Sequence, residues 1–76
     1  MRIYLGGHLS FYHSQKERWL EVELSQPTPL TMILSKAGIP LGEVELVSIN
    51  GVLVDLAKAV ITSEDQVRLY SAVGGG

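Results

Sequence analysis

The residues with the clearest chemical potential are the glycines that close the printed chain, Gly74, Gly75 and Gly76, which follow Val73. Residues without a Cβ let the backbone enter a narrow channel and approach a reacting centre closely. Four extended residues reach about 13 Å, at about 3.3 Å per residue. The pattern predicts a flexible tail over 73–76 that presents the carboxylate of Gly76. The alternative is a frayed end with no role.

Other side chains that could carry chemistry are few. His8 and His13 stand five residues apart, but no cysteine or carboxylate lies at a spacing that would complete a metal site, so we predict no bound metal. The absence of cysteine excludes disulfides, thiolate catalysis and cysteine-ligated zinc. The sequence also has no phosphate-binding loop, dinucleotide motif or triad pattern. We therefore do not expect the chain to be an enzyme by itself or to bind a cofactor.

Composition places these residues in one small folded domain. With 76 residues and 46% hydrophobic side chains, the chain can bury one core and has no room for a second. Six basic and eight acidic residues give a net charge of -2 and are scattered, which disfavours nucleic-acid binding. The first residues lack the apolar stretch of a signal peptide, and no apolar run could cross a bilayer. We expect a soluble cytoplasmic protein without membrane contact.

Two strands are predicted in the first third of the chain. Ile3 and Leu5 alternate with polar or aromatic neighbours, which is the period of a strand with one buried face. Residues 8–14 fit either a strand or a loop. A full strand is expected over 17–24, with its leucines and valine on one face. Trp19 is out of phase with them, so it should project from the face opposite the core.

A short helix follows. Thr28 is the expected N-cap and Pro29 the first helical residue, because threonine accepts from free amides and proline has no amide to satisfy. Gly38 should end the helix in a left-handed conformation. The apolar stripe that should pack on a sheet consists of Leu30, Ile33, Leu34 and Ala37.

Asn50 and Gly51 mark a tight hairpin turn between two further strands, because both residue types tolerate positive φ. The segment 55–65 is expected to be a connector in which Val60 and Ile61 form a buried plug.

The last strand is predicted over 66–72. Val67 and Leu69 should point into the core, and Arg68 and Tyr70 should point outward. The element order is then strand, strand, helix, strand, strand, strand. This order predicts an α+β roll, with a mixed four- or five-stranded sheet and one helix across one face. The β-grasp (ubiquitin-like) arrangement is the simplest that satisfies it, over residues 1–72.

Several motifs resemble the ThiS/MoaD family of ubiquitin-like sulfur carriers, which serve thiamine thiazole or molybdopterin synthesis. Two departures from the family pattern are visible: Ser63 precedes the acidic pair where Gly-Asp is common, and three glycines stand where two are usual. The glycine ending is nearer the thiamine type and the long first hairpin nearer the molybdopterin type, so the pathway stays open. The motifs are Ile49-Asn50-Gly51, Val54-Asp55-Leu56, Ile61, Glu64-Asp65-Gln66-Val67-Arg68-Leu69 and Ala72-Val73-Gly74-Gly75-Gly76.

The resemblance implies a reaction at the chain end. A partner adenylating enzyme, similar to ubiquitin-activating enzymes, uses ATP to convert the carboxylate of Gly76 into an acyl-adenylate. Sulfide from a relay replaces AMP, and the thiocarboxylate donates sulfur in a synthase, of which the carrier can be the small subunit. The carrier acts as a protein co-substrate, and ATP is bound by the partner.

The resemblance also implies a partner-binding face. The first and last strands of a β-grasp sheet lie side by side and parallel at its centre, which would place Arg2 and Tyr4 beside Arg68 and Tyr70, with Trp19 on the neighbouring strand. Grouped aromatic and arginine side chains are typical of protein interfaces. With Val73, Gly74 and Gly75 of the tail, they form the predicted partner-binding set; the alternative is an ordinary sheet face.

Two other functions remain open. The chain could be a protein modifier that is conjugated to lysines through Gly76, or a non-covalent β-grasp binding module with an incidental tail.

Overall fold

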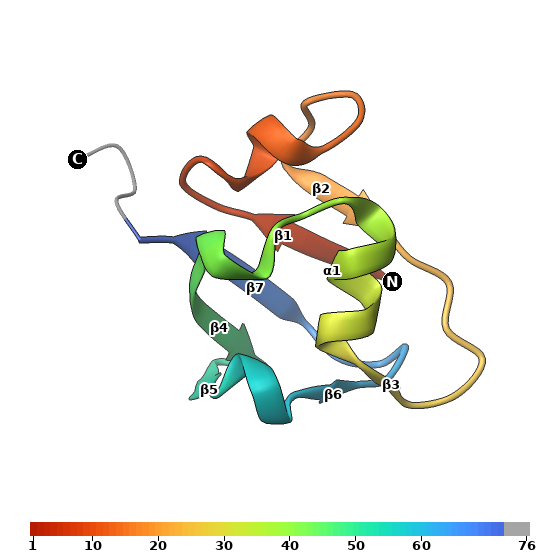
Figure 1. Cartoon of the computed structure of the whole chain (residues 1–76). Helices are drawn as coiled ribbons and strands as arrows, with labels where there is room; N and C mark the ends of the chain where they lie inside the picture. The colour runs from red at the N-terminus through yellow and green to blue at the C-terminus, as the bar shows by residue number, and fades with distance from the viewer. Residues whose placement is uncertain (73–76) are drawn as a thin grey trace.

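A mixed sheet of five strands dominates the fold, with strand order β2-β1-β7-β4-β5. The computed structural model describes residues 1–72. In Figure 1, β7 lies in the middle of the sheet between β1 and β4. β1 and β7 are parallel, with Ile3 opposite Val67, and all other neighbours are antiparallel. The strands are β1 (Arg2–Leu5), β2 (Trp19–Glu21), β4 (Val44–Ile49), β5 (Val52–Val54) and β7 (Val67–Ser71).

One α-helix, α1 (Leu30–Ala37), covers one face of this sheet (Figure 1). Three residues of its predicted stripe are buried, and Ala37 is half-buried against them. The predicted α+β class, with a mixed five-stranded sheet and one helix across it, is confirmed. The core between the two layers contains the aliphatic residues Ile3, Leu5, Leu9, Leu30, Ile33, Leu34, Ile39, Val47, Ile61, Val67 and Leu69.

The start of α1 differs from the prediction. Pro29 occupies the N-cap position, and the Thr28 hydroxyl donates a hydrogen bond to the carbonyl of Gln26 at 2.9 Å instead of capping the helix. The reason is that Thr28 and Pro29 form a short strand, β3, before the helix begins. The amide of Leu30 then donates to the carbonyl of Ala59 at 3.0 Å, so another segment supplies the missing partner. The predicted helix end is confirmed, because Gly38 is left-handed with φ of 78°.

The predicted connector contains ordered structure. A 3₁₀ helix spans Leu56–Lys58, and the two-residue strand β6 (Val60–Ile61) pairs with β3 (Thr28–Pro29) in a second small sheet. Ile61 is fully buried, as predicted, whereas Val60 is 54% exposed. The prediction of a buried Val60 is wrong because neighbouring residues of a strand point to opposite faces.

The first hairpin is shorter than predicted. β2 covers three residues, and the strand expected over 17–24 does not continue because the chain turns away after Val22 toward β3. Val22 still exchanges backbone hydrogen bonds with Met1, both at 3.0 Å. The 8–14 stretch contains a 3₁₀ helix at Leu9–Tyr12, which neither of the two predicted options included. Its Leu9 is fully buried and holds the turn against the core.

The Asn-Gly hairpin is confirmed, and it has a second function in the fold. Asn50 and Gly51 have φ of 54° and 85°, as a tight turn between β4 and β5 requires. The Asn50 side chain also donates to Asp65 Oδ1 and accepts from the amide of Gln66, both at 2.9 Å. Two sequence motifs that lie far apart in the chain therefore meet and fix the ends of β4 and β7.

The carboxylate of Asp65 accepts most of the hydrogen bonds in the turn before β7. It accepts from the Thr62 amide at 2.8 Å and from the Thr62 hydroxyl at 3.2 Å, in addition to Asn50. These hydrogen bonds, that of the Thr62 amide first and that of Asn50 next, hold the pKa of Asp65 below its usual value because they favour the ionised form.

The predicted orientation of the last strand is confirmed. In β7, Val67 and Leu69 are buried under α1, and Arg68 and Tyr70 project from the other side. Within residues 1–72, no helix combines the length and apolar character needed to cross a membrane.

Candidate functional site on the open face of the sheet

The face of the sheet that α1 leaves uncovered brings the predicted aromatic and arginine residues together. Tyr4 of β1 is opposite Trp19 of β2 on one side and Arg68 of β7 on the other. Directly paired residues of neighbouring strands share a face, so the strand alternation that buries Ile3 and Leu5 turns Tyr4 outward. The parallel pairing of β1 with β7 is what joins the two ends of the chain in this cluster.

Tyr4 lies between two other rings and contacts both of them. The ring centroids of Tyr4 and Trp19 are 5.2 Å apart, and the planes meet at 63° in an edge-to-face arrangement. The Tyr4 and Tyr70 centroids are 6.1 Å apart, at 59°. Both distances lie within the range of favourable aromatic pairs, which contribute about 0.5–1.5 kcal/mol each beyond burial. The rings therefore form a connected surface across β2, β1 and β7.

Both arginines lie over these rings. The guanidinium carbon of Arg2 is 4.3 Å from the centroid of the Trp19 ring, and that of Arg68 is 6.0 Å from the centroid of the Tyr4 ring. Cation–π contacts at exposed sites are worth about 0.5–1 kcal/mol, so they orient the two side chains without covering them. The surface combines the rings with two arginines, and Glu21, which is opposite Arg2, is an acidic neighbour at its β2 edge. Such a surface can bind a partner that offers apolar and acidic groups.

Two leucines of this face were not predicted from the sequence. Leu46 of β4 is opposite Tyr70. Leu53 of β5 lies in the neighbouring row, opposite Ser48, which is in turn opposite Arg68. Leu46 is 47% exposed and Leu53 is 66% exposed. The hairpin turn at Asn50 could have identified both leucines, because the turn sets the pairing register and the register determines which residues of the two strands point outward. We define the open-face patch as Arg2, Tyr4, Trp19, Leu46, Leu53, Arg68 and Tyr70.

Two glycines hold a loop against the end of β7. The amide of Gly6 donates to the carbonyl of Leu69 at 2.7 Å, and a Cβ on Gly6 would lie 2.6 Å from the Tyr70 ring atom Cδ1. Gly7 has φ of 61°, and the amide of His8 donates to the Ser71 hydroxyl at 2.9 Å. These contacts need residues without a side chain. The end of β7 is thus fastened to the loop that follows β1, immediately before residue 72.

The predicted tail, Val73, Gly74, Gly75 and Gly76, lies outside the described residues.

The two histidines do not assemble a metal site in the described part of the chain. His13 Nδ1 accepts a hydrogen bond from the Gln15 amide at 2.9 Å, which occupies that ring nitrogen. Among residues 1–72, no three or more histidine, aspartate or glutamate side chains are grouped so that they could hold an ion.

Comparison of the chain with protein-family models, with curated proteins and with solved structures gives no match. The strand order, the open-face patch and the sequence motifs are therefore the features that bear on function.

Proposed function

We propose that this protein is a ubiquitin-like sulfur carrier of the ThiS/MoaD type, whose carboxylate at Gly76 is activated by a partner enzyme. The observation that carries the proposal is the parallel pairing of β1 and β7 in the middle of the sheet. It places the open-face patch around the strand that leads into the glycine tail. A partner that binds the patch would receive the tail at a fixed distance from its docking surface.

The strand arrangement supports the β-grasp fold within this proposal. In the five-stranded sheet, the first strand (β1) and the last strand (β7) are adjacent and parallel, and β7 is central. A helix between the first hairpin and the later strands crosses one face only. The hydrogen bonds between Asn50 and Asp65 join two of the motifs on which the family resemblance rests.

The proposed chemistry divides the work between carrier and partner. A carboxylate is a poor electrophile, so a carboxylate oxygen of Gly76 first attacks the α-phosphorus of ATP in the partner enzyme and pyrophosphate leaves. Sulfide then attacks the carbonyl carbon, and AMP leaves with the bridging oxygen. The product is a thiocarboxylate that can transfer its sulfur in a synthase for thiamine thiazole or molybdopterin. The carrier contributes the docking face and the tail.

Intact-mass measurement of the protein from its native cell tests this proposal. We expect a species whose chain ends at Gly76 and whose mass exceeds the calculated mass by the difference between sulfur and oxygen. The matched control is the variant without Gly75 and Gly76, which should show no such gain. Isopeptide adducts on other proteins would instead indicate a modifier, and full activity of the shortened variant would indicate a non-covalent binding module.

A further inference from the structure

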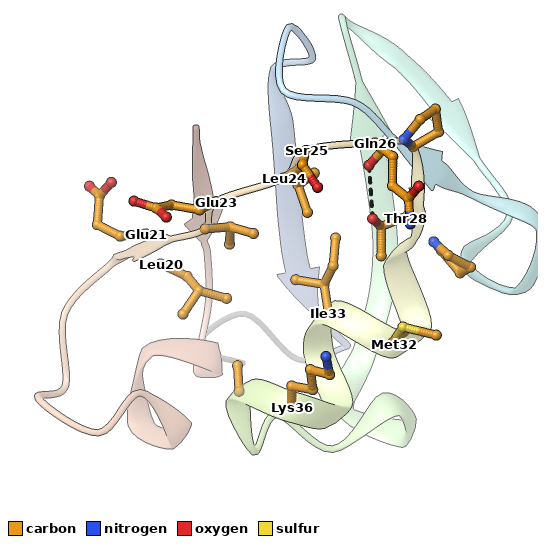
Figure 2. A pocket seen from close by; sticks show the side chains of 14 residues that line it. Leu20, Glu21, Glu23, Leu24, Ser25, Gln26, Thr28, Met32, Ile33 and Lys36 are labelled. Carbon is orange, nitrogen blue, oxygen red and sulfur yellow. Dashed lines mark hydrogen bonds between the residues drawn. The ribbon is translucent and has the colours of Figure 1, made fainter.

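A groove opens on the side of the molecule away from the end of β7. It has a volume of about 580 Å³ and lies between the segment 20–29 and α1 (Figure 2). Leu20 and Leu24 on one wall and Met32 and Ile33 on the other give it an apolar lining. Met32 is 49% exposed, although it belongs to the only α-helix of the described chain. The volume falls within the range of about 300–1,000 Å³ that is typical of ligand pockets.

The same groove borders an unpaired sheet edge. β2 is the outermost strand on its side. Arg18 accepts from the Leu5 amide at 2.7 Å, and Val22 bonds Met1, so these residues direct their backbone groups toward β1. Glu21 lies between these residues, so by alternation its backbone groups point outward, and no backbone partner takes them within residues 1–72. Such an edge is a template for an added strand.

The edge also carries two unpaired negative charges. Glu21 and Glu23 are exposed, and Figure 2 shows their carboxylates pointing away from Ile33 of the helix. Arg2 is opposite Glu21 in the sheet, but its guanidinium lies over the Trp19 ring instead. In the described part of the chain, neither carboxylate forms an ion pair. Lys36 on the far wall is a single positive charge, so the lining of the groove is net acidic.

We infer that the β2 edge and its groove bind an extended peptide segment of another protein, in which apolar residues alternate with lysine or arginine. An added strand places successive side chains on opposite faces, and cross-strand neighbours share a face. Its apolar residues would then enter the groove toward Met32 and Ile33. Its basic residues would lie beside Glu21 and Glu23. This inference does not rest on the proposed sulfur chemistry.

A second copy of the chain is a poorer occupant. The basic residues of the described strands are Arg2 in β1 and Arg68 in β7, and both strands are already paired inside the sheet. The occupant should therefore be a different protein.

The test uses the full chain and a fluorescein-labelled, end-capped peptide of sequence Ile-Lys-Val-Lys-Ile-Thr. We expect saturable binding by fluorescence anisotropy, with the largest amide NMR shifts in 19–29 and α1. A peptide of the same composition with its lysines adjacent, and a peptide with glutamates in place of lysines, should each bind about tenfold more weakly or not at all. Equal binding of all three, or shifts confined to β4, β5 and β7, would overturn the inference.

Charge reversal provides the matched variants. Glu21→Lys combined with Glu23→Lys should weaken binding of the alternating peptide by about tenfold and reduce its salt dependence. The control, Glu45→Lys combined with Glu64→Lys, makes the same change in net charge at exposed positions outside the groove and should leave the affinity within about twofold. Circular dichroism confirms that both variants fold. Equal losses in the two variants, or the same amide shifts on concentrating the chain without peptide, would count against the site.

Discussion

The two faces of the central sheet use the same strands for different purposes. On the helix side, Ile3 and Leu69 are fully buried among aliphatic neighbours. On the other side, their neighbours Tyr4 and Tyr70 form ring contacts while staying partly exposed. Because the side chains of a strand alternate, one residue step separates a position that stabilises the fold from one that can bind a partner. Stability and recognition can therefore be changed independently.

The comparison is sharpest in β7, where a core residue and a patch residue are adjacent. Leu69→Ala should lower the free energy of unfolding by about 2–5 kcal/mol, because it leaves a cavity in a closely packed core. Tyr70→Ala should cost only about 1 kcal/mol, since its ring is partly exposed already. Urea denaturation of both variants measures the difference. A larger loss for Tyr70→Ala would contradict the division between the two faces.

Binding of a partner should depend on the patch residue Tyr70 more than its small effect on stability suggests. Tyr70→Ala should weaken docking to the proposed adenylating partner by about tenfold, because truncated aromatic residues at interface centres commonly cost 1 kcal/mol or more. Titration calorimetry measures the affinity. Val60→Ala is the matched control, because Val60 is an exposed apolar residue in the separate small sheet of β3 and β6. Unchanged affinity in Tyr70→Ala would remove the open-face patch from the docking surface.

A smaller effect tests whether the rings act as one surface. The double-mutant cycle of Tyr4→Ala and Trp19→Ala should give a coupling energy of about 0.5–1.5 kcal/mol in the free energy of unfolding, because the rings meet edge to face. The control cycle pairs Tyr4→Ala with Val60→Ala and should be additive. A coupling energy of zero between Tyr4 and Trp19 would show that the two rings do not stabilise each other.

The smallest effect concerns Asp65, which lies on neither face. Its pKa is lowered by the Thr62 amide and by Asn50, so the ionised form stabilises the folded state above the ordinary aspartate pKa of about 3.9. This contribution should disappear as the pH falls through the lower pKa of the folded protein. Asp65→Asn should therefore be less stable than the natural protein at neutral pH.

The difference between the two proteins should shrink in acid. Denaturation at a series of pH values measures it, and a difference that does not depend on pH would contradict the proposed ionisation. Chemical-shift changes during the titration should centre on Asn50 and Thr62. The signals of the rings on the open face should not change.

The large elements were predictable because their signals are local and repeated. Alternation identified β1 and the orientation of β7, and the Asn-Gly pair located the β4–β5 hairpin. The pairing of β3 with β6 left no such signal, because two residues are too few for a period to show. That pairing is the reason why the cap predicted at Thr28 and the buried side chain predicted at Val60 are both wrong.

The candidate site was predictable in part. Alternation placed Tyr4, Trp19 and Tyr70 outside the core, but their adjacency required the strand order, which came from the family resemblance. Leu46 and Leu53 were missed because an apolar residue in a strand is first taken for core. Only the pairing register separates the two cases.

The parallel pair at the centre of the sheet also affects how the chain folds. Ile3 must find Val67, near the opposite end of the described chain, before the sheet can close. The β4–β5 hairpin can form early because its contacts are local, whereas the β1–β7 pair requires closure of nearly the whole chain. During synthesis, one edge of β1 therefore stays unpaired until the last strand leaves the ribosome. A chain cut before residue 67 should lack a stable native state.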